Sequence, residues 1–255
     1  MLALTVLPSP FMARGQRTHV ARVAIDHRTA VRQHAAYCQM LRDCGVDVIT
    51  LEVNRDLPDG TFVEDTAVVF DEAAVLTSMG IEARRPELAG VEPELGKYRA
   101  LHRIEPPANI EGGDVLRVGR TFLVGLSART NRAGVEAFEA IVSRYGYRVL
   151  SVPVHQCLHL KTACTALPDD ALLVNPAWLD PEPLHEFARI SVPEDEPWAA
   201  NTLLVNGIVC IAAANVQTAD LLHGRGFKVQ TVDLSEFAKA EGCVTCLSLL
   251  LGPSR

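Results

Sequence analysis

Pairs of short apolar segments joined by tight turns recur along this chain, and helical segments separate them. The clearest turn is Asn206-Gly207, which lies between two apolar runs within residues 203–212. Both turn residues tolerate the positive φ angles that a two-residue hairpin requires. Residues 67–77 and 115–124 show the same pattern, in which two apolar runs flank a short turn. The chain is therefore predicted to contain repeated β-hairpins.

Helices with an apolar stripe alternate with these hairpins at intervals of roughly 40–50 residues. In the helix predicted over residues 27–44, the apolar face consists of Val31, Ala35, Cys38 and Leu41. The other predicted elements are helices over residues 131–145 and 215–224, and strands over residues 20–25, 46–53, 147–152, 228–232 and 246–250. Neither simple β-α-β alternation nor separate runs of strands and helices fits this order. The repetition indicates a radial or stacked α/β architecture.

The chain shows no sign of a division into domains. Pro-rich segments at residues 180–183 and 193–197 are predicted to be loops, and no low-complexity linker interrupts the sequence. The length of 255 residues allows one substantial hydrophobic core. We therefore expect a single domain over residues 1–255.

Charge and cysteine content restrict the partners and the compartment of the protein. The net charge is −7, and lysine and arginine are scattered among acidic residues, so a nucleic-acid partner is not expected. No apolar run reaches the length of a membrane span, and Pro8 and Pro10 interrupt the apolar start. The seven cysteines are irregularly spaced, which is typical of reduced thiols. We expect a cytoplasmic protein without a membrane partner.

Cys243 and Cys246 form a C-x-x-C pair that allows several interpretations. Half of a zinc site would require further ligands, and the sequence contains no second C-x-x-C pair. A redox pair would lie at the start of a helix after a strand, whereas this pair runs into an apolar segment. Two buried structural cysteines are a further alternative. A catalytic thiolate would need a histidine from elsewhere in the chain.

His159 is the candidate partner for such a thiolate. It lies between two leucines, and a histidine in an apolar segment is often only a buried core residue. The other seven histidines occur in helical or loop segments that are predicted to be solvated. Catalysis by His159 is therefore favoured only in combination with a candidate nucleophile such as Cys246.

Two acidic motifs could bind a planar cation. Asp65 and Glu111 lie next to small residues, and a carboxylate can bind a guanidinium group through two parallel hydrogen bonds. The two glycines after Glu111 would let a ligand approach the backbone closely, although the motif could also be only a turn. Arg84 and Arg129 could bind a carboxylate of the same ligand.

Taken together and in order, six short motifs resemble those of the dimethylarginine dimethylaminohydrolases, a family of the guanidino-modifying pentein superfamily. The resemblance runs from about residue 8 to residue 250, nearly the whole chain. The motifs are PDGTFVED at 58–65, GIEARRPE at 80–87, EGGD at 111–114, ARTN at 128–131, LHLK at 158–161 and EGCVTCLS at 241–248.

This resemblance implies an α/β propeller of about five ββαβ modules with pseudo-fivefold symmetry. It implies that Cys246 attacks a guanidinium carbon and that His159 protonates the departing amine and then activates water. Asp65 and Glu111 would hold the guanidinium group. The other residues implied to lie near the substrate are Arg84 and Arg129 at its α-carboxylate, Asp59, Glu64, and Gln16 in a loop over the site. No metal or organic cofactor is implied.

The expected ligand is a small guanidino amino acid, and the protein could form a homodimer. Related arginine and agmatine deiminases carry an acid two residues after the histidine, where this chain has Lys161. One carboxylate fewer favours a methylated arginine over arginine itself. Gly15-Gln16 and Ser78-Met79 differ from the usual Gly-Leu and Arg-Pro of the family, which keeps another N-substituted arginine such as hydroxyarginine as an alternative. A non-catalytic guanidino-binding protein is the third interpretation.

Overall fold

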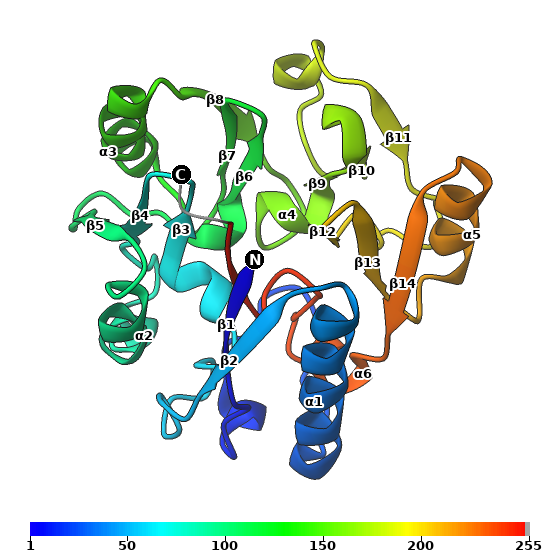
Figure 1. The fold of residues 1–255 in the computed structure, drawn as a ribbon, viewed down its shortest axis with the longest axis horizontal. Helices are drawn as coiled ribbons and strands as arrows, with labels where there is room; N and C mark the ends of the chain where they lie inside the picture. Colours follow the sequence, from blue (N-terminus) through cyan, green and yellow to red (C-terminus); the bar gives the residue numbers. More distant parts are fainter. Residues whose placement is uncertain (253–255) are drawn as a thin grey trace.

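Five three-stranded sheets surround a common axis in the computed structural model, which describes residues 1–252 (Figure 1). In each sheet the middle strand pairs antiparallel with one neighbour and parallel with the other. A parallel pair requires a crossover connection, which is usually a helix. The prediction of an α/β propeller built from five modules is confirmed.

Four modules follow the order hairpin, crossover and third strand, while the fifth combines β15 with β1 and β2 from the other end of the described chain. The sheets are β3 (Ala67–Val69), β4 (Ala73–Leu76) and β5 (Ala100–Arg103); β6 (Val115–Val118), β7 (Thr121–Leu126) and β8 (Arg148–Pro153); β9 (Cys164–Ala166), β10 (Leu172–Val174) and β11 (Arg189–Ser191); β12 (Thr202–Val205), β13 (Ile208–Ala212) and β14 (Lys228–Val232); and β15 (Leu249–Leu251), β1 (Leu2–Val6) and β2 (Asp47–Leu51). The α-helices are α1 (His27–Asp43), α2 (Glu87–Leu95), α3 (Arg132–Val142), α4 (Leu160–Ala163), α5 (Val216–Gly224) and α6 (Ser235–Ala238).

Four crossovers contain an α-helix of nine residues or more, namely α1, α2, α3 and α5. The crossover between β10 and β11 contains only the 3-10 helix Glu182–Leu184. The short helices α4 and α6 have another position, because they precede the first strands β9 and β15 of their modules. These two helices lie close to the residues that form the candidate site.

The fifth sheet joins the two ends of the described chain. Leu2 pairs with Leu251 and Leu4 with Leu249 in antiparallel register, so β1 and β15 close the ring. The expected strand over residues 20–25 is wrong, since those residues form no strand. The strand lies at residues 2–6 instead, where four successive residues are buried. A strand buried on both faces lacks the polar alternation by which strands are recognised.

The helix predicted over residues 27–44 is confirmed as α1, and Cys38 and Leu41 of its predicted inner face are buried, but Val31 and Ala35 are not. Val31 is 37% exposed and Ala35 also faces solvent. The buried stripe includes Gln33, whose amide donates hydrogen bonds to Asp233 Oδ2 and Ser235 Oγ at 2.8 Å each. It also includes Tyr37, whose hydroxyl donates to the carbonyl of Val244 at 2.9 Å. The buried face includes polar side chains that are satisfied by hydrogen bonds within the protein, so a pattern of apolar residues does not identify it.

The start of α5 also differs from the expected cap. Asn215 occupies the position before the helix, as predicted, but its side chain makes no capping hydrogen bond. The carboxylate of Glu196 accepts the N–H groups of Gln217 and Thr218 at 2.8 Å each instead. A side chain from a preceding loop therefore satisfies the free N–H groups of the first turn.

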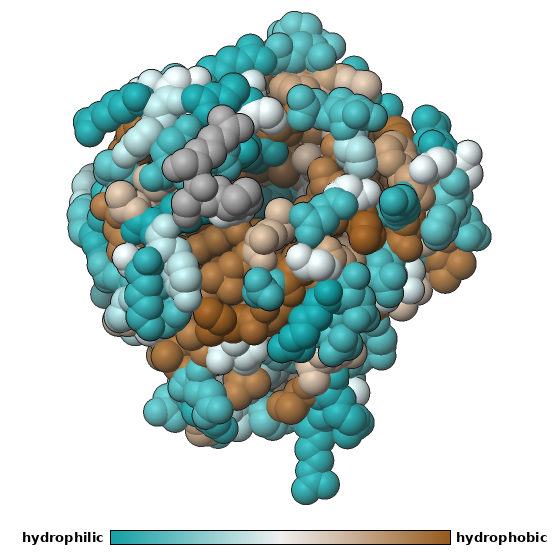
Figure 2. All heavy atoms as spheres, viewed as in Figure 1, coloured by the Kyte–Doolittle hydropathy of each residue, from teal (hydrophilic) through white to brown (hydrophobic). Residues whose placement is uncertain are grey.

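The hairpin turn Asn206-Gly207 is confirmed, with φ angles of 47° and 77°. The hydrophobic core is divided among clusters that lie between neighbouring modules, such as Phe70, Phe122 and Phe138 with Tyr147. Figure 2 shows apolar residues gathered around the middle of one face, while hydrophilic residues dominate its periphery. Within residues 1–252, none of the helices combines the length and apolar character needed to span a lipid bilayer.

His34 on α1 was expected to be solvated, yet it is only 2% exposed, and its Nε2 has no hydrogen-bond partner among the described residues. Burial lowers the pKa of His34 to about 4. The unfolded chain binds the same proton near pH 6.5. Acidification from pH 6.5 to pH 4 therefore favours the unfolded state, and the resulting loss of stability is complete below the pKa of His34 in the folded state.

We predict that His34→Phe removes this share of the acid sensitivity, up to about 3 kcal/mol at pH 4. Phenylalanine fills a similar volume without titrating. Urea unfolding at pH 7.5 and pH 4.5 would measure the free energy of unfolding of the wild type and the variant. The exposed His185 supplies the control variant His185→Phe. An unchanged pH dependence in His34→Phe would show that this buried imidazole does not control acid stability.

Candidate active site

Turns that precede the inner strands of four of the five modules supply the central residues of the candidate site. The 3-10 helix Val63–Thr66 precedes β3 and carries Asp65, and Glu111 stands directly before the 3-10 helix that leads into β6. His159 stands directly before α4, which leads into β9. Cys246 lies in the turn that leads into β15. The pseudo-symmetry of the fold thereby brings together residues that are far apart in the sequence.

A small cavity of about 30 Å³ lies where these turns converge. Seven of the nine predicted site residues line this cavity, namely Gln16, Asp59, Asp65, Arg84, Arg129, His159 and Cys246. Such a volume holds about two water molecules by the usual measure. The cavity is too small for an amino acid, so a wall must move before a ligand of that size can enter.

Cys246 does not begin the last strand, contrary to the prediction, because β15 starts three residues later. Its Sγ accepts the backbone N–H of Cys243 at 3.4 Å, so the C-x-x-C spacing forms a turn over the sulfur. Burial, followed by the carboxylate of Glu64, raises the pKa of Cys246 well above its usual value. Burial also raises the pKa of Cys243 to about 12. Both thiols are therefore protonated at neutral pH without a bound cation.

His159 lies at the start of a short helix and not on a strand. Its Nε2 is 2.7 Å from Glu111 Oε2 and 3.9 Å from Asp65 Oδ1. Burial disfavours the imidazolium ion, but the carboxylates of Asp65, Asp114 and Glu111 outweigh burial and raise the pKa of His159 to about 9. The ring is consequently a proton donor at neutral pH.

The two glycines of the EGGD motif are required by this close packing. A Cβ atom on Gly113 would lie 2.6 Å from Nδ1 of His159 and 2.8 Å from Oδ1 of Asp65. A Cβ atom on Gly112 would lie 1.9 Å from the carbonyl oxygen of Glu64. The sequence indicated a close approach of a ligand, whereas the structure shows a close approach of protein groups.

Arg84 holds Asp65 in place from behind. Its Nη1 donates to Asp65 Oδ2 at 2.8 Å, while Nε and Nη2 grip the two oxygens of Glu87 at 3.0 and 2.8 Å. Burial opposes ionisation of Asp65, but His159 and Arg84 overcome it and lower the pKa of Asp65 to about 2. Sequence reasoning gave no role to Glu87, although its position three residues after Arg84 is the usual spacing of a helical ion pair.

Glu111 is fully buried and is held ionised in a similar way. Its Oε1 accepts the N–H of Gly80 at 3.0 Å, and Arg129 Nη1 is 3.5 Å from each carboxylate oxygen. Burial opposes ionisation, yet the hydrogen bond and charge of His159 lower the pKa of Glu111 below its usual value. Glu111 is absent from the cavity wall, and it reaches the site through His159.

Asp65, Glu111 and His159 each offer a donor atom within 4.8 Å of the others, a geometry that a metal ion could use. Their lone pairs already have partners, because Asp65 accepts from Gly113 N–H and Arg84, and Glu111 accepts from Gly80 N–H and His159. Two guanidinium groups beside the cluster also oppose a dication. Among the described residues, neither cysteine of the C-x-x-C pair belongs to a group of three such donors.

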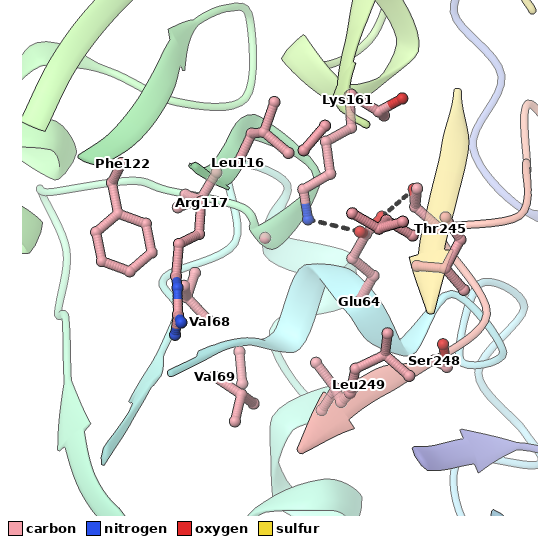
Figure 3. Close-up of a pocket in the computed structure, with 18 of the residues that line it drawn as sticks. Glu64, Val68, Val69, Leu116, Arg117, Phe122, Lys161, Thr245, Ser248 and Leu249 are labelled. Carbon is pink, nitrogen blue, oxygen red and sulfur yellow. Dashed lines mark hydrogen bonds and ion pairs between the residues drawn. The ribbon is translucent and has the colours of Figure 1, made fainter. Parts of the chain in front are cut away.

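Glu64 and Lys161 lie on the opposite side of the site wall. Glu64 Oε1 is 2.6 Å from Lys161 Nζ, and both residues line a separate cavity of about 400 Å³ along the propeller axis (Figure 3). Glu64 was predicted to lie near the substrate, but it does not line the cavity that contains Cys246. The ammonium group of Lys161 likewise lies away from that cavity. The residue at this position, which is an acid in the related deiminases, therefore places no charge in the cavity that contains Cys246.

Two carboxylates fasten the loop of residues 15–20 over the site. Asp59 accepts the N–H of Gln16 at 3.0 and 3.2 Å, and a Cβ atom on Gly15 would lie 2.1 Å from Asp59 Oδ1. Glu241 Oε1 accepts three successive backbone N–H groups, from Thr18 to Val20. Glu241 belongs to a quoted motif, yet the sequence gave no sign of this function, since its partners lie more than two hundred residues away.

Comparison with known proteins agrees with this geometry. Residues 15–177 match the family described as N,N dimethylarginine dimethylhydrolase, eukaryotic. An N(G),N(G)-dimethylarginine dimethylaminohydrolase of Streptomyces coelicolor is 41% identical over 250 residues, which cover 98% of this chain and 96% of the relative. The chain belongs to the dimethylarginine dimethylaminohydrolase family.

Two comparisons with the bacterium Pseudomonas aeruginosa support the same assignment. Its N(G),N(G)-dimethylarginine dimethylaminohydrolase is 35% identical over 226 residues, which cover 88% of this chain and 89% of the relative. A solved structure of a cysteine-to-serine mutant of the enzyme from this organism, complexed with citrulline, has a TM-score of 0.92 and 33% identity. It covers 97% of this chain and 98% of that one.

The carboxylate of Glu241 should control how often the loop opens. Glu241→Ala removes the acceptor of three N–H groups, each worth about 1 kcal/mol. We predict that amide hydrogen exchange at residues 18–20 becomes faster by a factor of about ten or more. Alkylation of Cys246 by iodoacetamide should also become faster, since the thiol is reached by the same opening. Mass spectrometry measures both rates.

Glu136→Ala is the matched control, because Glu136 is exposed on α3, away from the site. It should change neither rate. Exchange in Glu241→Ala that equals the wild type would mean that other contacts, such as the bond from Arg17 Nε to the carbonyl of Lys239, hold the loop.

Proposed function

We propose that this chain hydrolyses N-methylated arginine to citrulline and an alkylamine through a covalent intermediate on Cys246. The observation that carries this proposal is the convergence of Cys246, His159 and Asp65 on one closed cavity, with Glu111 hydrogen-bonded to His159. Nearly full-length relatives named as dimethylarginine dimethylaminohydrolases support the same activity.

The substrate carries a planar cation, and the site offers anions to hold it. Asp65 on the cavity wall and Glu111 behind His159 both stay ionised, since the pKa of each lies below its usual value. Asp59, also on the cavity wall, is buried beside the loop of residues 15–20. A guanidinium group presents N–H donors in a fixed plane that suits carboxylates. In this proposal Arg84 and Arg129 attract the α-carboxylate of the same substrate.

A bound substrate cation favours deprotonation of the Cys246 thiol. The pKa of Cys246 is raised by burial and neighbouring carboxylates, so the resting sulfur carries its proton. A guanidinium group next to the sulfur favours the thiolate through its charge. The thiolate therefore forms mainly when substrate is bound. The thiol proton passes to solvent water, since His159 already carries its own proton, and Cys243 N–H donates a hydrogen bond to the sulfur.

The reaction then proceeds in two steps. The Cys246 thiolate forms a bond to the guanidinium carbon, and the C–N bond to the alkylamine breaks as His159 supplies the proton that the amine needs. Water next attacks the same carbon and gives a proton to His159. The C–S bond then breaks as the remaining hydroxyl proton passes to the sulfur, which releases citrulline and restores the thiol of Cys246. A pKa of about 9 makes His159 a proton donor at neutral pH in the first step.

The two cysteines of the C-x-x-C turn should differ in function. Cys246→Ser should abolish turnover, with a loss of at least about 10³-fold, because a serine hydroxyl here has no base strong enough to activate it. Cys243→Ser keeps the backbone N–H that faces Cys246 Sγ and should retain most of the activity. Citrulline formation is the assay. Equal losses in the two variants would support a dithiol or metal site and contradict a single nucleophile.

Substrate preference is the direct test of the proposed function. No carboxylate at position 161 faces the cavity, so N–H donors on that edge of plain arginine would remain poorly matched. An unmatched buried polar group costs about 1–3 kcal/mol, which corresponds to tens of fold in kcat/KM. We predict that monomethyl- and dimethylarginine yield citrulline and alkylamine, and that arginine reacts more slowly by this factor.

Quantification of citrulline, ornithine and amine for arginine, both methylarginines and hydroxyarginine separates the alternatives. Gln16 on the cavity wall has an amide that could serve a polar substituent. Hydroxyarginine as the only substrate, with dimethylarginine untouched, would overturn the proposed specificity.

A further inference from the structure

The side of Cys246 that faces the propeller axis contains a buried chain of polar groups. Lys161 Nζ is 2.6 Å from Glu64 Oε1, and Thr245 Oγ1 donates to Glu64 Oε2 at 2.7 Å. Figure 3 shows Glu64 between these two side chains at the end of the axial cavity. Each carboxylate oxygen of Glu64 therefore has one partner, and one of the two is a cation.

This chain is rigidly attached to the nucleophile. The N–H of Glu64 donates to the carbonyl of Cys246 at 3.2 Å, and Thr245 Oγ1 lies 4.0 Å from Cys246 Sγ. Asn201 Nδ2 donates to Thr245 Oγ1 at 3.0 Å and to the carbonyl of Lys161 at 2.9 Å. The threonine hydroxyl accepts from Asn201 and gives its proton to Glu64, so it has none to give to the sulfur.

The electrostatic consequence for Cys246 is unfavourable unless Glu64 is neutralised. Burial has the largest effect on the pKa of Cys246, and the carboxylate of Glu64 has the next largest. Both oppose the thiolate that the reaction requires. The other charged or titratable groups around Cys246 are Asp59, Asp65, Arg84, Arg129, His159 and Glu241, with Cys243 in the same turn. Lys161 lies outside this cavity and is the cation paired with Glu64 itself.

We propose that Lys161 is a positioning residue that permits thiolate formation at Cys246 by neutralising Glu64 from the axial side. The Glu64 carboxylate accepts a hydrogen bond from Thr245 Oγ1, while the backbone N–H of Glu64 donates to the carbonyl of Cys246. Lys161 acts through Glu64 and does not touch the substrate cavity. This inference depends on the proposed function only in taking Cys246 as the nucleophile.

The experiment compares Lys161→Met, Glu64→Gln and the double variant. The pH dependence of iodoacetamide alkylation is measured in the absence of substrate, with the modified cysteine identified by peptide mass spectrometry. Lys161→Met leaves Glu64 unpaired and should move the titration of Cys246 to higher pH by about one unit. Glu64→Gln should move it to lower pH. The double variant should return it close to the wild type.

Two controls separate this electrostatic function from a structural one. Lys161→Arg keeps the charge and should titrate like the wild type. Lys97→Met breaks an exposed ion pair with Glu94 and should have no effect. If Lys161→Met unfolds, Glu64→Gln alone still tests the direction of the shift.

A purely structural ion pair would make the double variant at least as impaired as either single variant. That result, or a Cys246 titration that Lys161→Met and Glu64→Gln both leave unchanged, would overturn the inference. Because alkylation needs no substrate, this failure is distinct from a failure to hydrolyse methylarginine. In an active enzyme, kcat/KM at pH 7 should fall about tenfold in Lys161→Met and recover in the double variant.

Discussion

The antiparallel pairing of β15 with β1 is the contact on which the candidate site depends. It closes the ring of five sheets, and Cys246 lies only three residues before β15. Its position opposite His159 is therefore fixed by a strand pair that is not itself part of the site. Three of the other modules deliver Asp65, Glu111 and His159 in the same way, from a turn just before the inner strand. The same position in these modules therefore carries chemically different side chains.

Charge balance is the second constraint on this site. Three carboxylates, two guanidinium groups and an imidazole lie in a volume where an unpaired charge would be costly. Arg84 is shared between Asp65 and Glu87, and Glu111 is shared between His159 and Arg129. These pairs hold Asp65 and Glu111 ionised, whereas burial raises the pKa of Glu87 to about 7 and the thiol of Cys246 stays protonated. In the proposed function, the bound substrate cation completes this balance of charge.

The sequence predicted the parts of the fold that local patterns encode. The hairpin at Asn206-Gly207 and the helices α1, α3 and α5 have local signals, and six motifs indicated most of the predicted site residues that line the cavity. Three features depend on tertiary contacts and could not be predicted in this way. They are the buried polar stripe of α1, the direction in which Lys161 points, and the capture of the loop by Glu241.

The strand β1 was missed for a related reason, and its position has a consequence for biosynthesis. Residues 2–6 are synthesised well before their antiparallel partner at residues 249–251. Until that partner is made, β1 has an apolar edge without it, which is the kind of edge that invites aggregation. Cys246 is synthesised only three residues before β15, which covers this edge. The nascent chain therefore passes through its most aggregation-prone stage before the chemistry of the site can exist.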